Sequence, residues 1–242
     1  MNAIEAKDLF KQYKKITAAD RLSIEIRRGE LFSLLGVNGA GKTTVIKMLT
    51  CITKPDGGDA SVGGYSIIKE PEKVKRLIGV SPQETAVAQN LSVKENLELI
   101  CGIYGFSKEK TERKINEITR QFSLDCVLKR KAGKLSGGWQ RRVSIAMAII
   151  SEPQILFLDE PTLGLDVIAR HELWKTVASL KGKATIILTT HYMEEAEALS
   201  DRIGIIKNGK ILTVGTAEEL KEKTGADTFE KAFVSIVKED AQ

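Results

Sequence analysis

A glycine-rich stretch that ends in a lysine and a threonine is the part of this sequence best suited to bind a polyanion. Residues 36–43 read Gly-Val-Asn-Gly-Ala-Gly-Lys-Thr and stand between an apolar run, residues 31–35, and a helix-compatible segment that starts at Thr44. Glycines let the backbone curl with its N–H groups pointing inward, and the following helix N-terminus adds the positive end of a dipole. Lys42 supplies a full charge for the β- and γ-phosphates. The stretch predicts a nucleoside triphosphate site in which Thr43 reaches the accompanying magnesium.

Two adjacent carboxylates follow a second apolar run. Residues 155–158, Ile-Leu-Phe-Leu, lead into Asp159 and Glu160, as when a buried strand delivers acidic groups to the edge of a sheet. We expect Asp159 to hold the magnesium, directly or through water. Glu160 should face elsewhere, because successive strand residues point to opposite sides, and it can accept a proton from an attacking water. In isolation such a pair is more often a helix N-cap, but beside a phosphate loop the catalytic interpretation is favoured.

A second candidate anion site lies farther along the chain. Residues 136–138, Ser-Gly-Gly, begin a helix that runs to about residue 150, so N–H groups and a hydroxyl would meet an anion at a helix N-terminus. Residues 189–191, Thr-Thr-His, end a strand just before an acidic helix at 194–199. A second anion site on one chain makes sense only if it serves another nucleotide.

The elements that must position these residues are predicted by apolar periodicity. Short strands joined by tight turns are expected at residues 4–9, 22–26, 31–35 and 60–65, and a mainly helical stretch from 92 to 130. From residue 155 onward strands alternate with helices: a strand at 155–158, a helix at 168–180 and a strand at 185–190. That alternation favours an α/β fold with a parallel sheet and right-handed crossovers. The phosphate loop, the acidic strand end and the next strand end then share one edge.

The C-terminal quarter carries two local signals. Asn208-Gly209 predicts a type I′ hairpin turn between strands at 203–206 and 211–214. In the tail, Phe229, Phe233 and Ile236 fall on one helical stripe, which is expected to dock on the core rather than on a partner.

Composition limits the class of protein. The chain has 242 residues, a formal net charge of +5 and basic residues scattered in mixed runs with acidic ones, which is typical of solvated helix faces and does not favour nucleic acid as a partner. Its apolar runs are far shorter than the roughly 20 residues that span a bilayer, so no transmembrane helix is expected. Its first residues lack the long apolar stretch of a secretory signal, so a cytoplasmic location is expected. Its three cysteines are expected to be buried, reduced thiols.

Taken together, these motifs resemble those of ATP-binding-cassette (ABC) transporter nucleotide-binding subunits. The resemblance rests on the Walker A motif at residues 36–43, the signature at 135–139, the Walker B strand ending at Asp159, Glu160 beside it and His191, in family order and spacing. It implies a P-loop NTPase core with a mainly parallel sheet, an antiparallel β subdomain and an inserted α-helical subdomain. The expected division is one ATPase domain at 1–216, with core segments 1–83 and 151–216 and a helical insertion at about 84–150, followed by a helical tail at 217–242.

The resemblance also implies roles for individual residues. Tyr13 matches the aromatic residue that stacks on adenine, Gln83 the Q-loop glutamine that touches magnesium and water, and His191 the switch histidine at the γ-phosphate. Each of these could be merely structural if it stood alone. The implied catalytic residues are Glu160, His191, Gln83 and Lys42; the metal residues are Thr43, Gln83 and Asp159; the nucleotide-binding residues are Tyr13, Gly36, Val37, Asn38, Gly39, Ala40, Gly41, Lys42, Thr43, Thr44, Ser136, Gly137 and Gly138.

Two residues depart from the family pattern. Trp139 stands where glutamine is most common in the signature, and Leu163 replaces the small residue that commonly begins the D-loop at 163–166. Ser136, Gly137 and Gly138 are intact, so phosphate recognition should survive both changes.

The implied partners are a second ABC subunit and a multispanning membrane permease, with ATP and Mg²⁺ as ligands. A homodimer is expected, with a heterodimer as the alternative, and the subunit would lie on the inner face of the cell membrane. Residues 84–97 and 191–209 are similar to those of subunits that serve export permeases for drugs, sodium or lipid-linked polymers. The alternative is a soluble ABC-type ATPase that acts on nucleic acid or ribosomes. A merely structural, degenerate cassette is disfavoured because Lys42, Asp159, Glu160 and His191 are all present.

Overall fold

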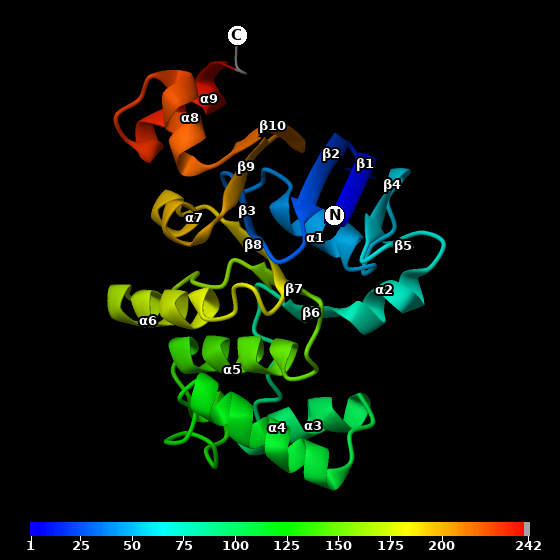
Figure 1. Cartoon of the computed structure of the whole chain (residues 1–242), viewed down its shortest axis with the longest axis vertical. Coiled ribbons are helices and arrows are strands. Elements are labelled where there is room, and N and C mark those ends of the chain that lie inside the picture. Colours follow the sequence, from blue (N-terminus) through cyan, green and yellow to red (C-terminus); the bar gives the residue numbers. More distant parts are fainter. Residues whose placement is uncertain (240–242) are drawn as a thin grey trace.

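Two β-sheets of different kinds organise the chain in the computed structural model, which describes residues 1–239 (Figure 1). The larger sheet has the strand order β10-β9-β3-β8-β7-β6. The five strands from β9 to β6 run parallel to one another, and β10 closes the edge antiparallel to β9. This arrangement confirms the predicted α/β fold with a mainly parallel sheet. The strands are β3 (Leu31–Leu35), β6 (Ile78–Ser81), β7 (Ile155–Asp159), β8 (Thr185–Thr190), β9 (Arg202–Lys207) and β10 (Lys210–Gly215).

The smaller sheet is antiparallel and has the order β2-β1-β4-β5. Its first two strands are much longer than the apolar alternation predicts and contain several register shifts. A single strand at 60–65 is wrong, because Gly63 and Gly64, with φ of 61° and 91°, turn the chain there and divide it into two strands. The strands are β1 (Asn2–Tyr13), β2 (Ile16–Arg27), β4 (Gly57–Val62) and β5 (Tyr65–Ser66).

The helices cover both faces of the larger sheet. One apolar core joins the two sheets and the helix α1 that follows β3. A second core lies on the other face and contains side chains of α3, α4, α5 and α6. The helices are α1 (Lys42–Leu49), α2 (Pro71–Leu77), α3 (Val93–Ile103), α4 (Lys108–Gln121), α5 (Gly137–Ile149), α6 (Val167–Ala178), α7 (Met193–Leu199), α8 (Ala217–Thr224) and α9 (Phe229–Glu239), with a 3₁₀ turn at Ala132–Lys134.

The region predicted to be mainly helical forms a layer of its own. Helices α3, α4 and α5 lie together at one end of the molecule, away from the smaller sheet (Figure 1). Ser92 and Glu95 form a capping box at the start of α3, and Ser107 caps α4. These caps satisfy N–H groups that would otherwise be unpaired and divide the stretch into two helices.

The C-terminal signals of the sequence are confirmed. Asn208 and Gly209 have φ of 48° and 78° and join β9 to β10. Phe229, Phe233 and Ile236 are buried in a third apolar core with residues of β9 and α7, so α9 packs on its own chain. The three cysteines are free thiols, but the prediction that all are buried holds for Cys101 alone, because Cys51 is half-buried and Cys126 is exposed. Among residues 1–239, no helix has both the length and the apolar character needed to cross a bilayer.

Candidate active site

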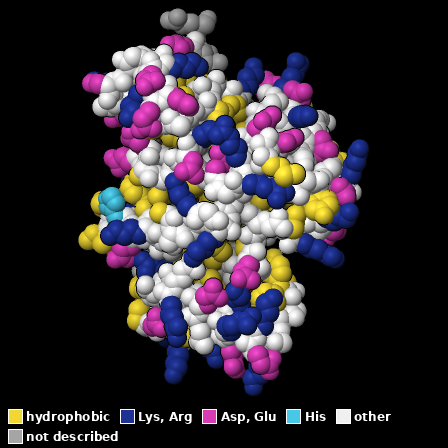
Figure 2. All heavy atoms as spheres, viewed as in Figure 1, with side chains coloured by type: hydrophobic (Ala, Val, Ile, Leu, Met, Phe, Trp, Pro, Cys, Tyr) yellow, Lys and Arg dark blue, Asp and Glu magenta, His cyan; other side chains and the backbone are white. Residues whose placement is uncertain are grey.

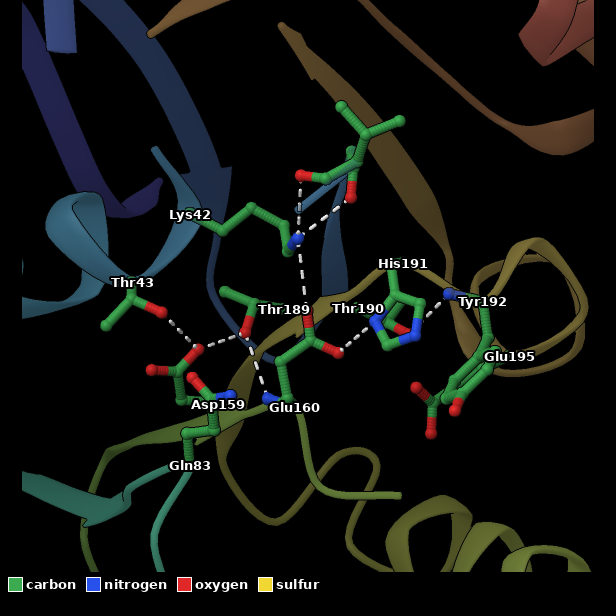
Figure 3. A network of polar contacts seen from close by, with 12 residues as sticks. Lys42, Thr43, Gln83, Asp159, Glu160, Thr189, Thr190, His191, Tyr192 and Glu195 are labelled. Carbon is green, nitrogen blue, oxygen red and sulfur yellow. Dashed lines mark hydrogen bonds and ion pairs between the residues drawn. The ribbon is translucent and has the colours of Figure 1, made fainter. Parts of the chain in front are cut away.

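The site lies where three neighbouring strands of the larger sheet end. β3, β8 and β7 are adjacent and parallel, so their carboxyl ends meet at one edge of the sheet. The glycine-rich loop leaves β3, Asp159 is the last residue of β7, and His191 follows β8. Figure 3 shows that side chains from these three places converge. The shared edge that the sequence predicts is therefore present.

Close backbone contacts explain two glycines of the loop. A Cβ on Gly36 would lie 2.3 Å from the carbonyl oxygen of Ile206, and a Cβ on Gly41, whose φ is 107°, would lie 2.2 Å from the carbonyl oxygen of Ala18. Only glycine fits at either position. Helix α1 begins at Lys42 with neither a side-chain cap nor an acidic residue in its first turn. Its first N–H groups are thus available to a phosphate.

The Lys42 side chain folds back over this loop. Its ammonium donates to the carbonyl oxygens of Gly36 and Val37, at 2.8 and 3.2 Å, and lies 3.1 Å from Oε1 of Glu160 (Figure 3). The side chains of Lys42 and Glu160 are each only 6% exposed. Removal of Glu160 would leave the ammonium with two carbonyl oxygens only, and removal of Lys42 would leave the buried carboxylate with His191 as its remaining partner.

Glu160 joins the loop to His191. Its Oε2 lies 2.7 Å from Nδ1 of His191. The two carboxylates have different partners, as expected, but strand alternation is not the reason. β7 ends at Asp159, and Glu160 adopts φ of 49° while its N–H donates to the carbonyl and hydroxyl oxygens of Thr189. This left-handed conformation is uncommon for a residue other than glycine, and it turns Glu160 toward Lys42 and His191.

Asp159 faces two hydroxyl groups. Its Oδ1 accepts hydrogen bonds from Thr189 at 2.5 Å and from Thr43 at 3.3 Å. A carboxylate and a hydroxyl are oxygen ligands of the kind that Mg²⁺ takes when it binds through one or two side chains and the phosphates of a nucleotide. The residues present therefore fit a magnesium ion. Gln83 follows β6, which pairs with β7, and it is drawn near Asp159 in Figure 3.

Tyr13 is exposed at the turn between β1 and β2. The same hairpin reaches the glycine-rich loop, because Ala18 of β2 is the residue against which Gly41 packs. The ammonium of Lys11 lies 5.5 Å from the centre of the tyrosine ring.

The second candidate anion site is separate from this network. Ser136 is the N-cap residue of α5, but its hydroxyl makes no capping hydrogen bond, and the first turn contains no acidic residue. Ser136 and Gly137 are exposed. A Cβ on Gly138 would lie 3.4 Å from Cβ of Ala169 on α6, so the start of α5 lies beside the start of α6. Within the part of the chain that the structure describes, residues 136–138 take no part in the hydrogen bonds and ion pairs that join Lys42, Glu160, Asp159 and His191.

Trp139 and Leu163, the two residues that depart from the family pattern, both lie outside the Lys42 network. Trp139 packs its ring against the guanidinium of Arg142, whose Cζ lies 4.8 Å from the ring centre. Leu163 is 37% exposed, in the loop between Glu160 and α6.

Sequence reasoning missed a buried arginine that links α5 to the Gln83 loop. Arg141 is 5% exposed, and its guanidinium donates to the carbonyl oxygens of Pro82 and Gln83, at 2.6 and 2.5 Å. Burial lowers the pKa of Arg141, whereas the carboxylates of Asp159, Glu160 and Glu195 act in the opposite direction. In the sequence, Arg141 stands in the polar run Gln-Arg-Arg at residues 140–142, whose composition predicts solvent exposure and not burial. Its contacts tie the backbone at Gln83 to the helix that begins with the second anion site.

Comparisons with known proteins agree with this geometry. The family profile described as "ABC transporter" matches residues 19–163. The "Doxorubicin resistance ATP-binding protein DrrA" of Mycobacterium tuberculosis is 48% identical over 217 residues, which are 89% of this chain and 65% of that protein. This chain thus spans about two thirds of the length of that relative.

Two solved structures are similar to the whole fold. "Structure of ATP binding subunit of ABC transporter" has a TM-score of 0.86 and 31% identity and covers 97% of this chain and 99% of its own. "Dimeric structure of a post-hydrolysis state of the ATP-binding cassette MJ0796 bound to ADP and Pi" has a TM-score of 0.79 and 28% identity. The match covers 88% of this chain and 98% of that structure's chain.

Proposed function

The chain belongs to the ABC transporter family, and from that premise we propose that it is the ATP-hydrolysing subunit of a transporter, with ATP as substrate and Mg²⁺ as cofactor. The observation that carries the proposal is the buried contact of Lys42, Glu160 and His191 beside the glycine-rich loop. A cation, a carboxylate and an imidazole at the N-terminus of a helix are the groups that phosphoryl transfer to water requires.

Each group has a distinct task in this proposal. The loop N–H groups of residues 36–44 and the ammonium of Lys42 hold the β- and γ-phosphates, and the exposed ring of Tyr13 stacks on adenine. Thr43, Asp159 and Gln83 would hold a magnesium ion, which would supply positive charge next to the phosphates. Phosphate oxygens compete with Glu160 for Lys42, so nucleotide binding releases the carboxylate. Glu160 then accepts a proton from the attacking water, and His191 contacts the γ-phosphate.

We further propose that two subunits bind ATP between them, head to tail. The start of α5 is a helix N-terminus without a side-chain cap, and Ser136 and Gly137 there are exposed. The γ-phosphate on one subunit would meet Ser136, Gly137 and Gly138 of the other. Because both subunits then share this group, ATP favours the closed dimer, and hydrolysis removes the contact. A homodimer is the simplest form.

A mixing experiment tests the shared site. Lys42→Ala lacks a working loop, and Ser136→Arg blocks the anion site at α5, so neither variant alone should hydrolyse ATP. In a mixed dimer, one of the two sites combines an intact loop with an intact Ser136. We expect an equimolar mixture to regain about one quarter of the wild-type turnover, since half of the dimers are mixed and each has one working site. A mixture no more active than its parents would contradict a site shared between subunits.

The permease is proposed to dock in a groove between the core and the helical layer. The groove has a volume of about 360 Å³ and is lined mainly by apolar side chains, among them Ile52, Val80, Ile100, Tyr104 and Met147. It lies where the loop of Gln83 passes from β6 toward α3, so its shape depends on the segment that Arg141 ties to α5. A partner seated there would sense nucleotide through these contacts.

Ile52→Glu tests this docking surface. Ile52 is 65% exposed on the rim of the groove, so a carboxylate there should be tolerated by the fold and repel an apolar partner segment. We expect ATP turnover of the isolated chain within about twofold of wild type, and loss of co-purification with the membrane permease. Val234→Glu is the matched control, since Val234 is exposed on α9. If both variants retained the permease equally, the groove would be excluded as the surface on which the permease docks.

Export is the direction we propose, with the subunit on the inner face of the cell membrane. A relative with 48% identity is named for doxorubicin resistance, and resistance is commonly achieved by removal of the drug. The division into core segments 1–83 and 151–216, the insertion at about 84–150 and the tail from 217 is part of the same proposal.

A nucleic-acid partner is not favoured. Figure 2 shows Lys and Arg interspersed with Asp and Glu over the face in view, whereas nucleic-acid surfaces concentrate basic residues. Binding to nucleic acid with a steep dependence on salt would revive this alternative.

A further inference from the structure

A buried glutamate lies four residues after His191, in the first turn of α7. Glu195, on α7, is 0% exposed, and Figure 3 shows it beyond His191 and Tyr192. Its Oε1 accepts a hydrogen bond of 3.0 Å from Nε1 of Trp174 on α6. In the part of the chain that the structure describes, residues 1–239, no basic side chain forms an ion pair with it. A buried carboxyl costs free energy that an apolar side chain of similar size would not cost, so packing alone does not account for it.

The second oxygen of this carboxyl faces the loop that follows Glu160. Oε2 of Glu195 and the hydroxyl of Thr162 are both buried and lack a hydrogen-bond partner within normal geometry. Burial raises the pKa of Glu195, and the carboxylate of Glu160 adds to this, while the hydroxyls of Thr190 and Thr162 and the indole of Trp174 act against it. Thr162 and Thr190 are thus the hydroxyl groups nearest to this carboxyl, one in the loop after Glu160 and one at the end of β8.

Two contacts join the His191 turn to α6. The guanidinium of Arg170, on α6, lies 4.3 Å from the ring centre of Tyr192, which in turn lies 4.1 Å from the ring of His191. Glu195 and Trp174 make the second contact. α7 has only seven residues and no side-chain cap, so its position depends on tertiary contacts rather than on its own stability.

We propose that Glu195 is a positioning residue for ATP hydrolysis, which fixes α7 on α6 and on the loop after Glu160 and thereby holds His191 against Glu160. The inference rests on the proposed ATPase function. In this proposal, the distance between His191 and Glu160 depends on a fully buried side chain whose hydrogen bond is to Trp174.

Glu195→Gln and Glu195→Ala separate this role from packing. The amide of glutamine keeps an acceptor for Trp174 and a donor for Thr162, so Glu195→Gln should stay within about twofold of the wild-type kcat. Glu195→Ala should lower kcat at least about tenfold with little change in KM for ATP, because the phosphate loop is untouched. Trp174→Phe keeps an aromatic ring but loses the N–H donor and part of the ring volume, and it should lower kcat by a smaller factor. This variant replaces Glu195→Ala in the test if the alanine variant does not fold.

A double-mutant comparison identifies the residue through which Glu195 acts. If it works through His191, Glu195→Ala should cause no further loss in a protein that already carries His191→Ala. An additive loss in the double variant would overturn the inference, as would a wild-type kcat for Glu195→Ala.

The imidazole of His191 gives a readout that does not require turnover. The chain has two histidines, His171 and His191, so ¹⁵N spectra of the nucleotide-free protein contain the signals of two imidazole rings, a pair of nitrogens for each, and His171→Asn assigns them. The His191 signal should move in Glu195→Ala and stay in place in Glu195→Gln. An unmoved His191 signal in Glu195→Ala would overturn the positioning role. Absence of ATP turnover in the wild-type protein would instead overturn the proposed function, and the spectra would still decide whether Glu195 positions His191.

Discussion

Replacing Glu160 by Gln is expected to abolish steady-state ATP hydrolysis and to leave ATP binding intact. The amide has the size of the carboxylate and keeps one oxygen for Lys42, with its NH2 group toward His191, but it does not accept a proton from water at neutral pH. A positioned general base typically contributes 10² to 10⁴ in rate, so kcat should fall by about this factor. Phosphate release measures the turnover, and calorimetry measures the affinity for ATP.

The same variant should accumulate dimers when ATP is present. The γ-phosphate that both subunits bind is no longer removed, so the closed state persists. Size exclusion with ATP should show the dimer, and with ADP the monomer. Glu194→Gln is the matched control, because Glu194 is an exposed glutamate on α7 and should behave as wild type. Unimpaired turnover in Glu160→Gln would remove Glu160 as the base.

Lys42→Ala should weaken the binding of ATP itself. The variant loses the ammonium that lies at the mouth of the loop, and hydrogen bonds to charged groups contribute about 1.5–3 kcal/mol each, which corresponds to roughly 10- to 100-fold in affinity. It also leaves the buried Glu160 without its cation, which adds repulsion toward the phosphates.

Calorimetric titration with ATP in the presence of Mg²⁺ checks this result. Lys47→Ala is the control, since Lys47 lies exposed in the last turn of the same helix and should bind ATP as wild type does. Near-wild-type affinity in Lys42→Ala, in a protein that remains folded, would argue against the phosphate-loop assignment.

The parts of the fold that local chemistry determines were predictable. β8 occupies residues 185–190 as expected, because its run of β-branched and apolar residues lies in the buried interior of a parallel sheet. The Asn208-Gly209 turn was predictable because positive φ at two successive residues is a local requirement. The glycine-rich loop depends on close backbone contacts that only glycine allows, and so leaves a clear pattern in the sequence.

What depends on distant contacts was not predictable. The lengths of β1 and β2 follow from their pairing with each other through register shifts, not from apolar alternation. The direction of Glu160 depends on its positive φ and on the oxygens of Thr189, a residue 29 positions away. Arg141 and Glu195 stand in helical segments where charged side chains are normally solvated, so their burial is visible only once α5 and α7 are packed.

The placement of the site on three inner strands has a consequence for mutants. Lys42, Asp159 and His191 are anchored to β3, β7 and β8, which have a neighbouring strand on both sides. Fraying of the sheet edges does not reach these strands, so the strand ends that carry the site separate only when the sheet opens cooperatively. A substitution that merely lowers stability should therefore reduce the number of active molecules and leave each surviving molecule with its full rate.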